Sequence, residues 1–208
     1  MLDFVEYASL FQYSPRGKSA ISIKSREVTG TIKAGRYSDR FRQGTSKFIN
    51  ENYELFSSFL NPDATLVPAP RSSKIQEGSL WPALEIVNML AAFNLGTPAS
   101  CLIRRNAVKK SSLCYSADER PSIADQFDSM YVEDYVPSAN ITLVDDVLTL
   151  GRTSIAGASR LAEKFPNATI RVFTLMRTMG FVEIDNIRAP INGTISYNSF
   201  SGKCTREP

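Results

Sequence analysis

The sequence contains no histidine, and this absence removes several kinds of chemistry. Catalytic sites of the Ser-His-Asp and Cys-His kinds, proton transfer by imidazole and nearly all common zinc hydrolase sites need histidine. Any chemistry in this chain must therefore depend on carboxylates, cations, backbone donors or a metal ion carried by a ligand.

Cysteines are few and widely separated, at positions 101, 114 and 204. They form neither a CxxC pair nor an even set suited to a disulfide framework, so we expect a reducing cytoplasmic location. No apolar run reaches membrane-spanning length, and the N-terminus, with Asp3 and Glu6, lacks a secretory signal pattern. We therefore expect no membrane association.

A strong excess of charge is also absent, since 24 basic and 21 acidic residues leave a net charge of +3. This mild balance says little about nucleic acid. The 208 residues, 43% of them hydrophobic and 22% charged, have the composition of an ordinary globular protein. We expect one domain, residues 1–208, with a full hydrophobic core.

The most informative stretch of the chain is residues 141–153. It opens with an apolar, β-branched run that predicts a buried strand, and the adjacent carboxylates Asp145 and Asp146 follow at the expected end of that strand. A short turn containing Gly151 comes next, and residues 154–164 have the pattern of a helix. This order places an anion site beside a group that accepts hydrogen bonds from hydroxyls.

The N-terminus of the expected helix provides the anion site, because its unpaired N–H groups and dipole favour a phosphate. Gly151 permits close backbone approach, and the hydroxyls of Thr149 and Thr153 add donors without charge. Asp145 and Asp146 are suited to sugar hydroxyls or to a metal held by the ligand. The residues alone leave another reading open, in which the acidic pair caps a helix or binds a metal in an unrelated α/β enzyme.

The run LVDDVLTLGRT resembles the signature of type I phosphoribosyltransferases, which is an apolar strand, two acidic residues and a Thr-x-Gly-x-Thr loop. The resemblance implies that Asp145 and Asp146 meet the ribose hydroxyls of phosphoribosyl pyrophosphate and its Mg²⁺. It also implies that the loop grips the 5′-phosphate through Thr149, Leu150, Gly151, Arg152 and Thr153. Leu150 departs from the family, where Thr, Ser or Ala is common, but the backbone N–H remains.

A second anion site is expected after residues 64–67, which have the pattern of another buried strand. A proline-bounded loop with basic residues follows, and its alternative reading is a turn with exposed cations. In the family this position holds pyrophosphate, and the Val-Pro-x-Pro-Arg pattern resembles the branch related to the competence protein ComF. The resemblance assigns pyrophosphate to the Arg71 side chain and to the backbone around Pro68, Ala69, Pro70 and Ser72.

Residues 104–126 form a long, polar and poorly periodic segment. Family members carry a mobile catalytic loop here, and ComF-like chains have an Arg, a second Arg and a Phe to which Arg104, Arg120 and Phe127 could correspond. The loop cations proposed for the leaving group are Lys109, Lys110 and Arg120.

Other patterns predict strands at 20–25, 100–103 and 169–175, and helices at 39–60 and 81–93. The resemblance implies an α/β type I phosphoribosyltransferase fold with a mainly parallel central sheet flanked by helices. Its core would span about residues 64–176, and a small variable hood from about 1–60 and 177–208 would cover the acceptor.

The expected function is transfer of the phosphoribosyl group to an unidentified nitrogen acceptor, with Asp145, Asp146 and Arg71 as catalytic residues and Mg²⁺ as cofactor. Purine salvage members usually have an Asp base where Thr149 stands, which disfavours a purine acceptor of that type. One alternative is a non-catalytic module of the ComF type that binds a phosphoribosyl ligand or nucleotide in DNA uptake or processing. Another is nucleic-acid binding through the basic segments. A homodimer is left open.

Overall fold

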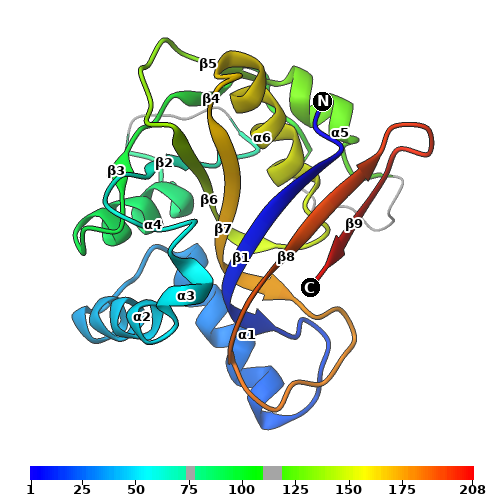
Figure 1. Cartoon of the computed structure of the whole chain (residues 1–208). Helices are drawn as coiled ribbons and strands as arrows, with labels where there is room; N and C mark the ends of the chain where they lie inside the picture. Colours follow the sequence, from blue (N-terminus) through cyan, green and yellow to red (C-terminus); the bar gives the residue numbers. More distant parts are fainter. Residues whose placement is uncertain (74–77, 110–118) are drawn as a thin grey trace.

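The computed structural model describes residues 1–73, 78–109 and 119–208 (Figure 1). Within these residues a seven-stranded sheet has the order β3-β2-β6-β7-β1-β8-β9, and β4 pairs with β5 in a second sheet. The strands of the large sheet are β1 Phe4–Tyr13, β2 Thr65–Pro68, β3 Thr97–Pro98, β6 Asn140–Leu148, β7 Thr169–Thr178, β8 Arg188–Asn198 and β9 Lys203–Glu207. The small sheet consists of β4 Leu102–Arg104 and β5 Met130–Val132.

The five strands from β3 to β1 run parallel to one another, whereas β8 and β9 add an antiparallel edge. Because parallel neighbours end at the same edge, β2 and β6 deliver the loops that follow them to one place. The register pairs Pro68 with Val144, directly before Asp145. The two loops singled out in the sequence therefore lie side by side.

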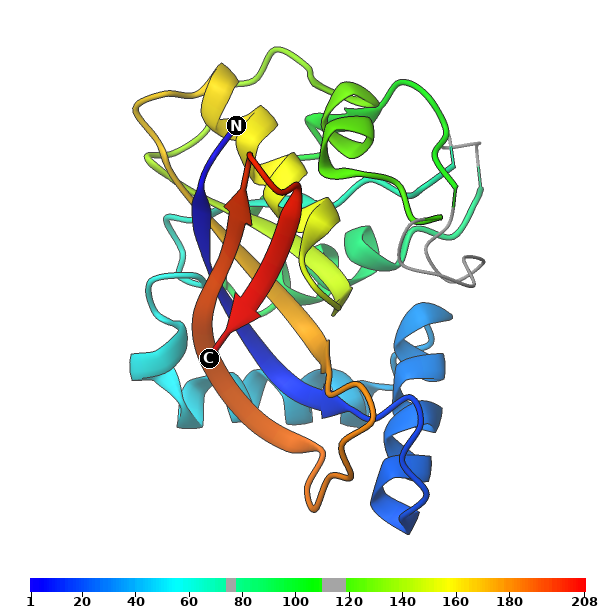
Figure 2. The same ribbon diagram turned by 90° about the vertical axis from the view of Figure 1, so that its right-hand side faces the viewer.

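Helices flank the sheet on both faces (Figure 2). Helix α6 packs on one face through Ile155 and Leu161, in a cluster that includes Leu143 of β6. The opposite cluster is covered by α1, α2, α3 and α4. The helix bounds are α1 Ala20–Lys33, α2 Asp39–Glu51, α3 Tyr53–Phe56, α4 Pro82–Ala91, α5 Ile123–Asp128 and α6 Arg152–Lys164. This arrangement confirms the expected α/β class, with a mainly parallel central sheet flanked by helices.

The strand expected at residues 20–25 is wrong, because these residues form the start of α1. Ser19 caps the helix by accepting a hydrogen bond from the Ser22 N–H at 3.1 Å. Ile21 and Ile23, which gave the segment its alternating pattern, are exposed by 37% and 45%. The helix buries small polar side chains instead, and these two isoleucines lie on its solvent-facing side.

Other elements agree with the sequence patterns or differ in detail. The strand expected at 100–103 begins at Leu102 and lies in the small sheet. The helix expected at 39–60 is divided at Asn52 into α2 and α3, and its Asn52 side chain donates to the Phe48 carbonyl at 2.8 Å. The patterns at 81–93 and 169–175 correspond to α4 and β7, and β6 continues through the acidic pair.

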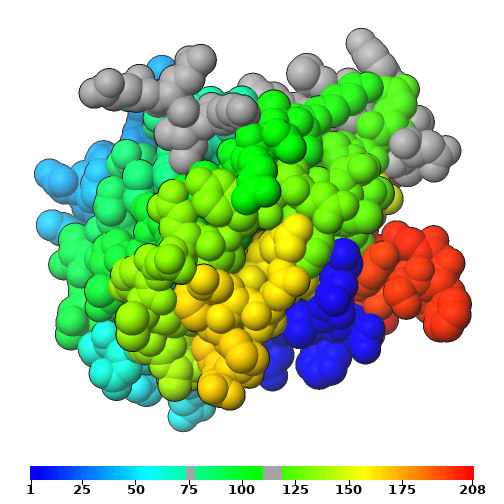
Figure 3. Space-filling view, turned by 90° about the horizontal axis from the view of Figure 1, so that it is seen from above, coloured from blue at the N-terminus to red at the C-terminus, as the bar shows by residue number. Residues whose placement is uncertain are grey.

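The large sheet also contains segments from both ranges assigned to the hood. Strand β1 lies between β7 and β8, and β9 forms the outer edge. Figure 3 shows the hairpin turn between β8 and β9 standing out beside the N-terminal residues. The division into core and hood, and the single domain of residues 1–208, stay predictions.

Among the helices of the described residues, none combines the length and the apolar character that crossing a membrane requires.

Candidate functional site

The loop between β6 and α6 is closed by Gly151, the N-cap residue of the helix. Its φ of +89° lies in the left-handed region that favours glycine. A Cβ at this position would lie 2.6 Å from Cγ2 of Ile195 in β8. Both the backbone conformation and the packing therefore require glycine where the sequence motif has one.

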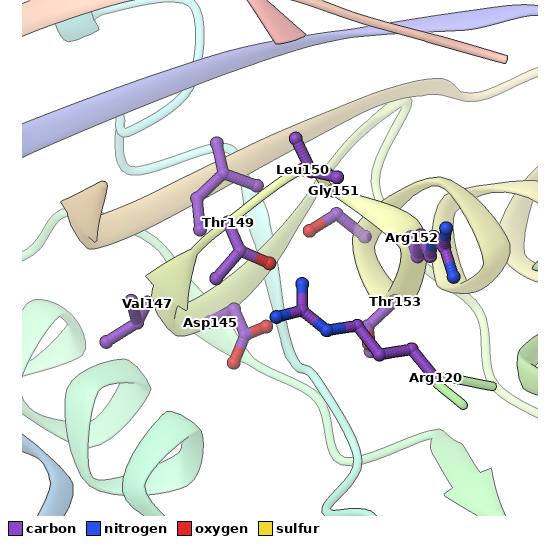
Figure 4. Close-up of a pocket in the computed structure, with 10 residues that line it drawn as sticks. Arg120, Asp145, Val147, Thr149, Leu150, Gly151, Arg152 and Thr153 are labelled. Atoms are coloured by element: carbon purple, nitrogen blue, oxygen red, sulfur yellow. The ribbon is translucent and has the colours of Figure 1, made fainter. Parts of the chain in front are cut away.

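A pocket lies at this junction, and the structure brings all five predicted loop residues, 149–153, together in its lining. Asp145 from the end of β6 contributes its carboxylate to the same pocket (Figure 4). The Arg120 side chain extends into the space between Asp145 and Thr149. An acidic group, hydroxyls, a guanidinium group and the start of a helix thus face one small volume.

The backbone of this junction offers donors to the pocket. Ile155 is the first residue of α6 whose N–H bonds back to the loop, to the Gly151 carbonyl at 2.8 Å. Among the described residues, the N–H groups of Arg152, Thr153 and Ser154 have no hydrogen-bond acceptor. These N–H groups and the positive end of the helix dipole make the junction suited to an anion.

The two carboxylates of the acidic pair have different surroundings. Asp145 lines the pocket, whereas Asp146 is not among the described residues that line it. The Asp146 N–H donates to Oδ1 of Asp145 at 2.9 Å. Burial raises the pKa of Asp145 well above its ordinary value, and the neighbouring Asp146 charge raises it further. Burial, and secondarily the Asp146 charge, raise the pKa of Tyr37 on the opposite face of the sheet.

In the described part of the chain, no group of three or more His, Cys, Asp or Glu residues is placed to hold a metal ion. Mg²⁺ commonly binds through one or two carboxylates together with substrate phosphates. The Asp145 carboxylate, close to the Asp146 charge and to the N-terminus of α6, fits that kind of shared site. Bound there, Mg²⁺ would be held by Asp145, with the Asp146 charge close by, and would neutralise phosphate charge.

The 68–72 loop follows β2 directly and is anchored on both sides. The Ala69 N–H donates to the Val144 carbonyl at 2.8 Å, and the Ala69 carbonyl accepts from Trp81 Nε1 at 2.7 Å. Pro68, Ala69 and Pro70 are buried, while Arg71 and Ser72 are partly exposed at the edge facing β6. Lys74, two residues after this loop, lies outside the described residues.

Arg104, in β4, holds this loop in place through hydrogen bonds. Its Nε donates to the Arg71 carbonyl at 2.7 Å, and its Nη1 donates to Gln126 Oε1 at 3.0 Å and to Ser129 Oγ. Burial lowers the pKa of Arg104 to about 10, with the Asp145 charge opposing the shift. The guanidinium group is thus used inside the protein, a role that its place in a polar segment did not reveal.

Two other arginines keep donors free. Among the described residues, Arg71 Nη1 and Arg120 Nε are buried and have no hydrogen-bond partner. Leaving a buried charged donor unpaired costs stability, so such groups call for an acceptor. Lys109 differs, because it forms an ion pair with Glu119 at 2.8 Å. Lys110, the remaining loop cation of the sequence analysis, lies outside the described residues.

Strand β9 lies in the range expected to form the hood, yet it contacts the 149–153 loop. Arg206 Nη1 donates to the Leu148 and Thr149 carbonyls, both at 3.1 Å. More than fifty residues separate these partners, and neither charge pattern nor periodicity links them. Only the position of β9 at the edge of the sheet brings them together.

No protein-family model matches the chain, and no curated protein is significantly similar to it in sequence. Among solved structures, the chain is similar to an adenine phosphoribosyltransferase at 15% identity and a TM-score of 0.36, over 70% of this chain and 82% of that one. The adenine phosphoribosyltransferase from Leishmania donovani is similar at 15% identity and a TM-score of 0.37, over 86% of this chain and 84% of that one. The adenine phosphoribosyltransferase from Leishmania tarentolae is similar at 16% identity and a TM-score of 0.33, over 80% of this chain and 83% of that one. The function proposed below rests on the geometry of the site and not on these similarities.

Proposed function

We propose that this chain is a phosphoribosyltransferase of the type I family, which binds phosphoribosyl pyrophosphate with Mg²⁺ and transfers the phosphoribosyl group to a nitrogen acceptor. The observation that carries the proposal is the pocket at the β6–α6 junction. There, N–H groups at the start of a helix, without an acceptor in the part of the chain that the structure describes, face one volume together with the Asp145 carboxylate. An anion donor site beside a hydrogen-bond acceptor matches a sugar phosphate.

The 149–153 loop and the first turn of α6 take the 5′-phosphate in this proposal. The N–H groups of Arg152, Thr153 and Ser154 supply donors, and the Thr149 and Thr153 hydroxyls add two more. Asp145 then accepts hydrogen bonds from the ribose hydroxyls. Asp146 supports Asp145 through its backbone N–H and adds negative charge for the metal ion.

The 68–72 loop takes the pyrophosphate. Arg71 and Arg120 each have a buried guanidinium donor without a hydrogen-bond partner among the described residues, and both lie on loops near Asp145. When the bond between C1 and the pyrophosphate oxygen breaks, negative charge grows on the leaving group and positive charge on the sugar. Fixed cations and backbone donors stabilise the leaving group, and the two loops hold the donor in one orientation.

The acceptor is restricted by Thr149. Its side chain carries a hydroxyl where a carboxylate base is usual in purine salvage members, so this position supplies no general base. The proposal therefore favours an acceptor nitrogen that is nucleophilic without losing a proton to this residue, such as a free amine.

Calorimetry with phosphoribosyl pyrophosphate and Mg²⁺ tests the proposal. We expect wild type to bind, and Asp145→Asn to bind at least about tenfold more weakly because a charged hydrogen-bond acceptor is lost. Asp134→Asn is the matched control, since this carboxylate is 98% exposed and pairs with Lys164. Equal affinity in wild type and Asp145→Asn would count against the site.

A second candidate function is ligand binding without turnover, as in a regulatory module of the ComF type. The absence of a base at Thr149 favours it, because binding needs no proton transfer. Pyrophosphate release, measured with a panel of bases and amines, separates the two. Release with any acceptor supports the enzyme, whereas binding without release across the panel supports the module.

A further inference from the structure

Strand β9, in the C-terminal hairpin, contacts the backbone carbonyls of the 149–153 loop and of the residue before it. Arg206 Nη1 lies 3.1 Å from both the Leu148 and the Thr149 carbonyl oxygens, and its Nη2 donates to the Thr178 carbonyl at 2.7 Å. One planar guanidinium group thus joins the end of β6 to the end of β7. A rigid fork of donors is suited to such bridging, and an ammonium group is not.

The next carbonyl of the loop is bound by the same strand. The Cys204 Sγ–H donates to the Leu150 carbonyl at 3.0 Å, and burial raises the pKa of this thiol to about 11, so it keeps its proton. Ile195 of the adjacent strand β8 packs against Gly151. Figure 2 shows the β8–β9 hairpin lying across α6 and this junction. Three consecutive carbonyl groups therefore face the hairpin.

The direction of these carbonyl groups also fixes the direction of the N–H groups that follow them in the chain. In a trans peptide the C=O and the following N–H point in opposite directions, and the described residues contain no cis peptide bond. With three carbonyls facing β9, the N–H groups of Thr149, Leu150 and Gly151 face away from it. None of the three has an acceptor among the described residues. Successive N–H groups that converge in this way form an anion-binding concavity.

We infer that Arg206 is a positioning residue for the phosphate site, because it fixes the carbonyls of the loop and so aims the N–H groups at the ligand. The inference rests on the proposed function of the 149–153 loop. Within the described residues, the Arg206 guanidinium gives three of its five N–H donors to backbone carbonyls, so we assign its effect to the backbone of the loop. Burial lowers the pKa of Arg206, with the nearby Tyr7 opposing the shift.

The test compares two anions that would bind to different loops. Calorimetry with ribose 5-phosphate probes the 149–153 loop, and calorimetry with inorganic pyrophosphate probes the 68–72 loop. In Arg206→Met we expect affinity for ribose 5-phosphate to fall about tenfold or more, while affinity for pyrophosphate stays within about twofold. Arg206→Lys should recover little, because it keeps the charge but loses the fork. Arg188→Met, which removes a charge from the same hairpin where Arg188 covers Phe48, is the control.

The outcomes separate the inference from the proposed function. If wild type binds neither anion, the proposed function fails. If wild type binds ribose 5-phosphate and Arg206→Met binds it equally well, the function stands and the positioning role is overturned. A parallel loss for both anions indicates general destabilisation and also overturns it, as does full recovery by Arg206→Lys, which indicates a simple charge effect. Should Arg206→Met fail to fold, Arg206→Lys alone carries the same comparison of the two anions.

Discussion

The two loops at the carboxyl edge of the sheet, 68–72 and 149–153, differ in backbone conformation and in the hydrogen-bond donors that they offer. The 68–72 loop is stiffened by Pro68 and Pro70, whose rings fix φ and leave no N–H at those positions. The 149–153 loop turns instead at Gly151, which has a φ of +89° and lies against Ile195. One loop therefore depends on side chains for its donors, chiefly Arg71, and the other depends on main-chain N–H groups.

Both loops are nevertheless held by an arginine from a more distant strand that binds their carbonyls. Arg104 of β4 binds the Arg71 carbonyl, and Arg206 of β9 binds the Leu148 and Thr149 carbonyls. Arg104 is 4% exposed and also pairs with two buried side chains, while the hydrogen bonds of Arg206 within the described residues go to backbone oxygens. In both loops, a guanidinium group from another strand therefore fixes the direction of backbone carbonyls.

The largest expected effect comes from Gly151→Ala. The left-handed backbone and the 2.6 Å approach to Ile195 should lower the free energy of unfolding by about 2–4 kcal/mol. Affinity for ribose 5-phosphate should fall steeply, with pyrophosphate less affected. Calorimetry and denaturant unfolding measure the two effects.

Gly202→Ala is the matched control for that change. Gly202 has a φ of +66°, but in the described structure no heavy atom lies within 4 Å of the added Cβ. We expect a loss of about 1 kcal/mol and unchanged binding of ribose 5-phosphate. If Gly202→Ala weakened this binding as much as Gly151→Ala, backbone strain in the hairpin, and not the loop itself, would explain the result.

Arg104→Met should affect the opposite loop. It leaves the Arg71 carbonyl and the buried Gln126 and Ser129 side chains without a donor, so we expect a loss of about 2–3 kcal/mol in stability. Pyrophosphate affinity should fall about tenfold, and ribose 5-phosphate affinity much less. Arg105→Met is the control, because Arg105 is exposed and its side chain stacks on Tyr131. Equal losses for both ligands would show that the loops are not braced independently.

A third variant alters stability away from both loops. The pKa of Glu183 is lowered to about 2 by hydrogen bonds from the Lys18 N–H, the Ser22 hydroxyl and the Ser19 N–H. Because the folded pKa lies below the ordinary value of 4.5, this contribution to stability is present above about pH 4.5 and is lost as pH falls toward 2. Thermal unfolding should show a lower Tm for Glu183→Gln at pH 7, with the gap to wild type closing in acid. A gap that is constant with pH would contradict this account, and binding at either loop should not change.

The smallest effect is expected from Leu150→Thr. The Leu150 side chain is 45% exposed and lines the pocket, so a hydroxyl at this position adds a donor without repacking the core. We expect affinity for ribose 5-phosphate to rise by no more than about threefold, with pyrophosphate unchanged, by calorimetry. A large gain would mean that the backbone donors contribute less than the comparison of the two loops implies.

Local pattern was sufficient where neighbouring residues determine the structure. Residues 141–164 predicted a strand, a loop and a helix in this order, and the five loop residues line one pocket. The pattern failed at residues 20–25, where alternating isoleucines point to solvent because the core accepts the serine face of α1. It also gave Asp145 and Asp146 equal roles, although only Asp145 is among the described residues that line the pocket.

The sequence by itself determined the positions of the two loops and the glycine that the second loop requires, and the resemblance of its 141–153 motif to a known family implied the mainly parallel α/β class. The two loops and the glycine are local features, since they depend on hydrophobic periodicity and on the conformational freedom of single residues. Only the tertiary structure decided that β1 lies inside the sheet and that Arg104 and Arg206 bind the backbone carbonyls of the two loops. These contacts join residues far apart in the chain, and the packing of strands, which no short segment encodes, brings the partners within hydrogen-bonding distance.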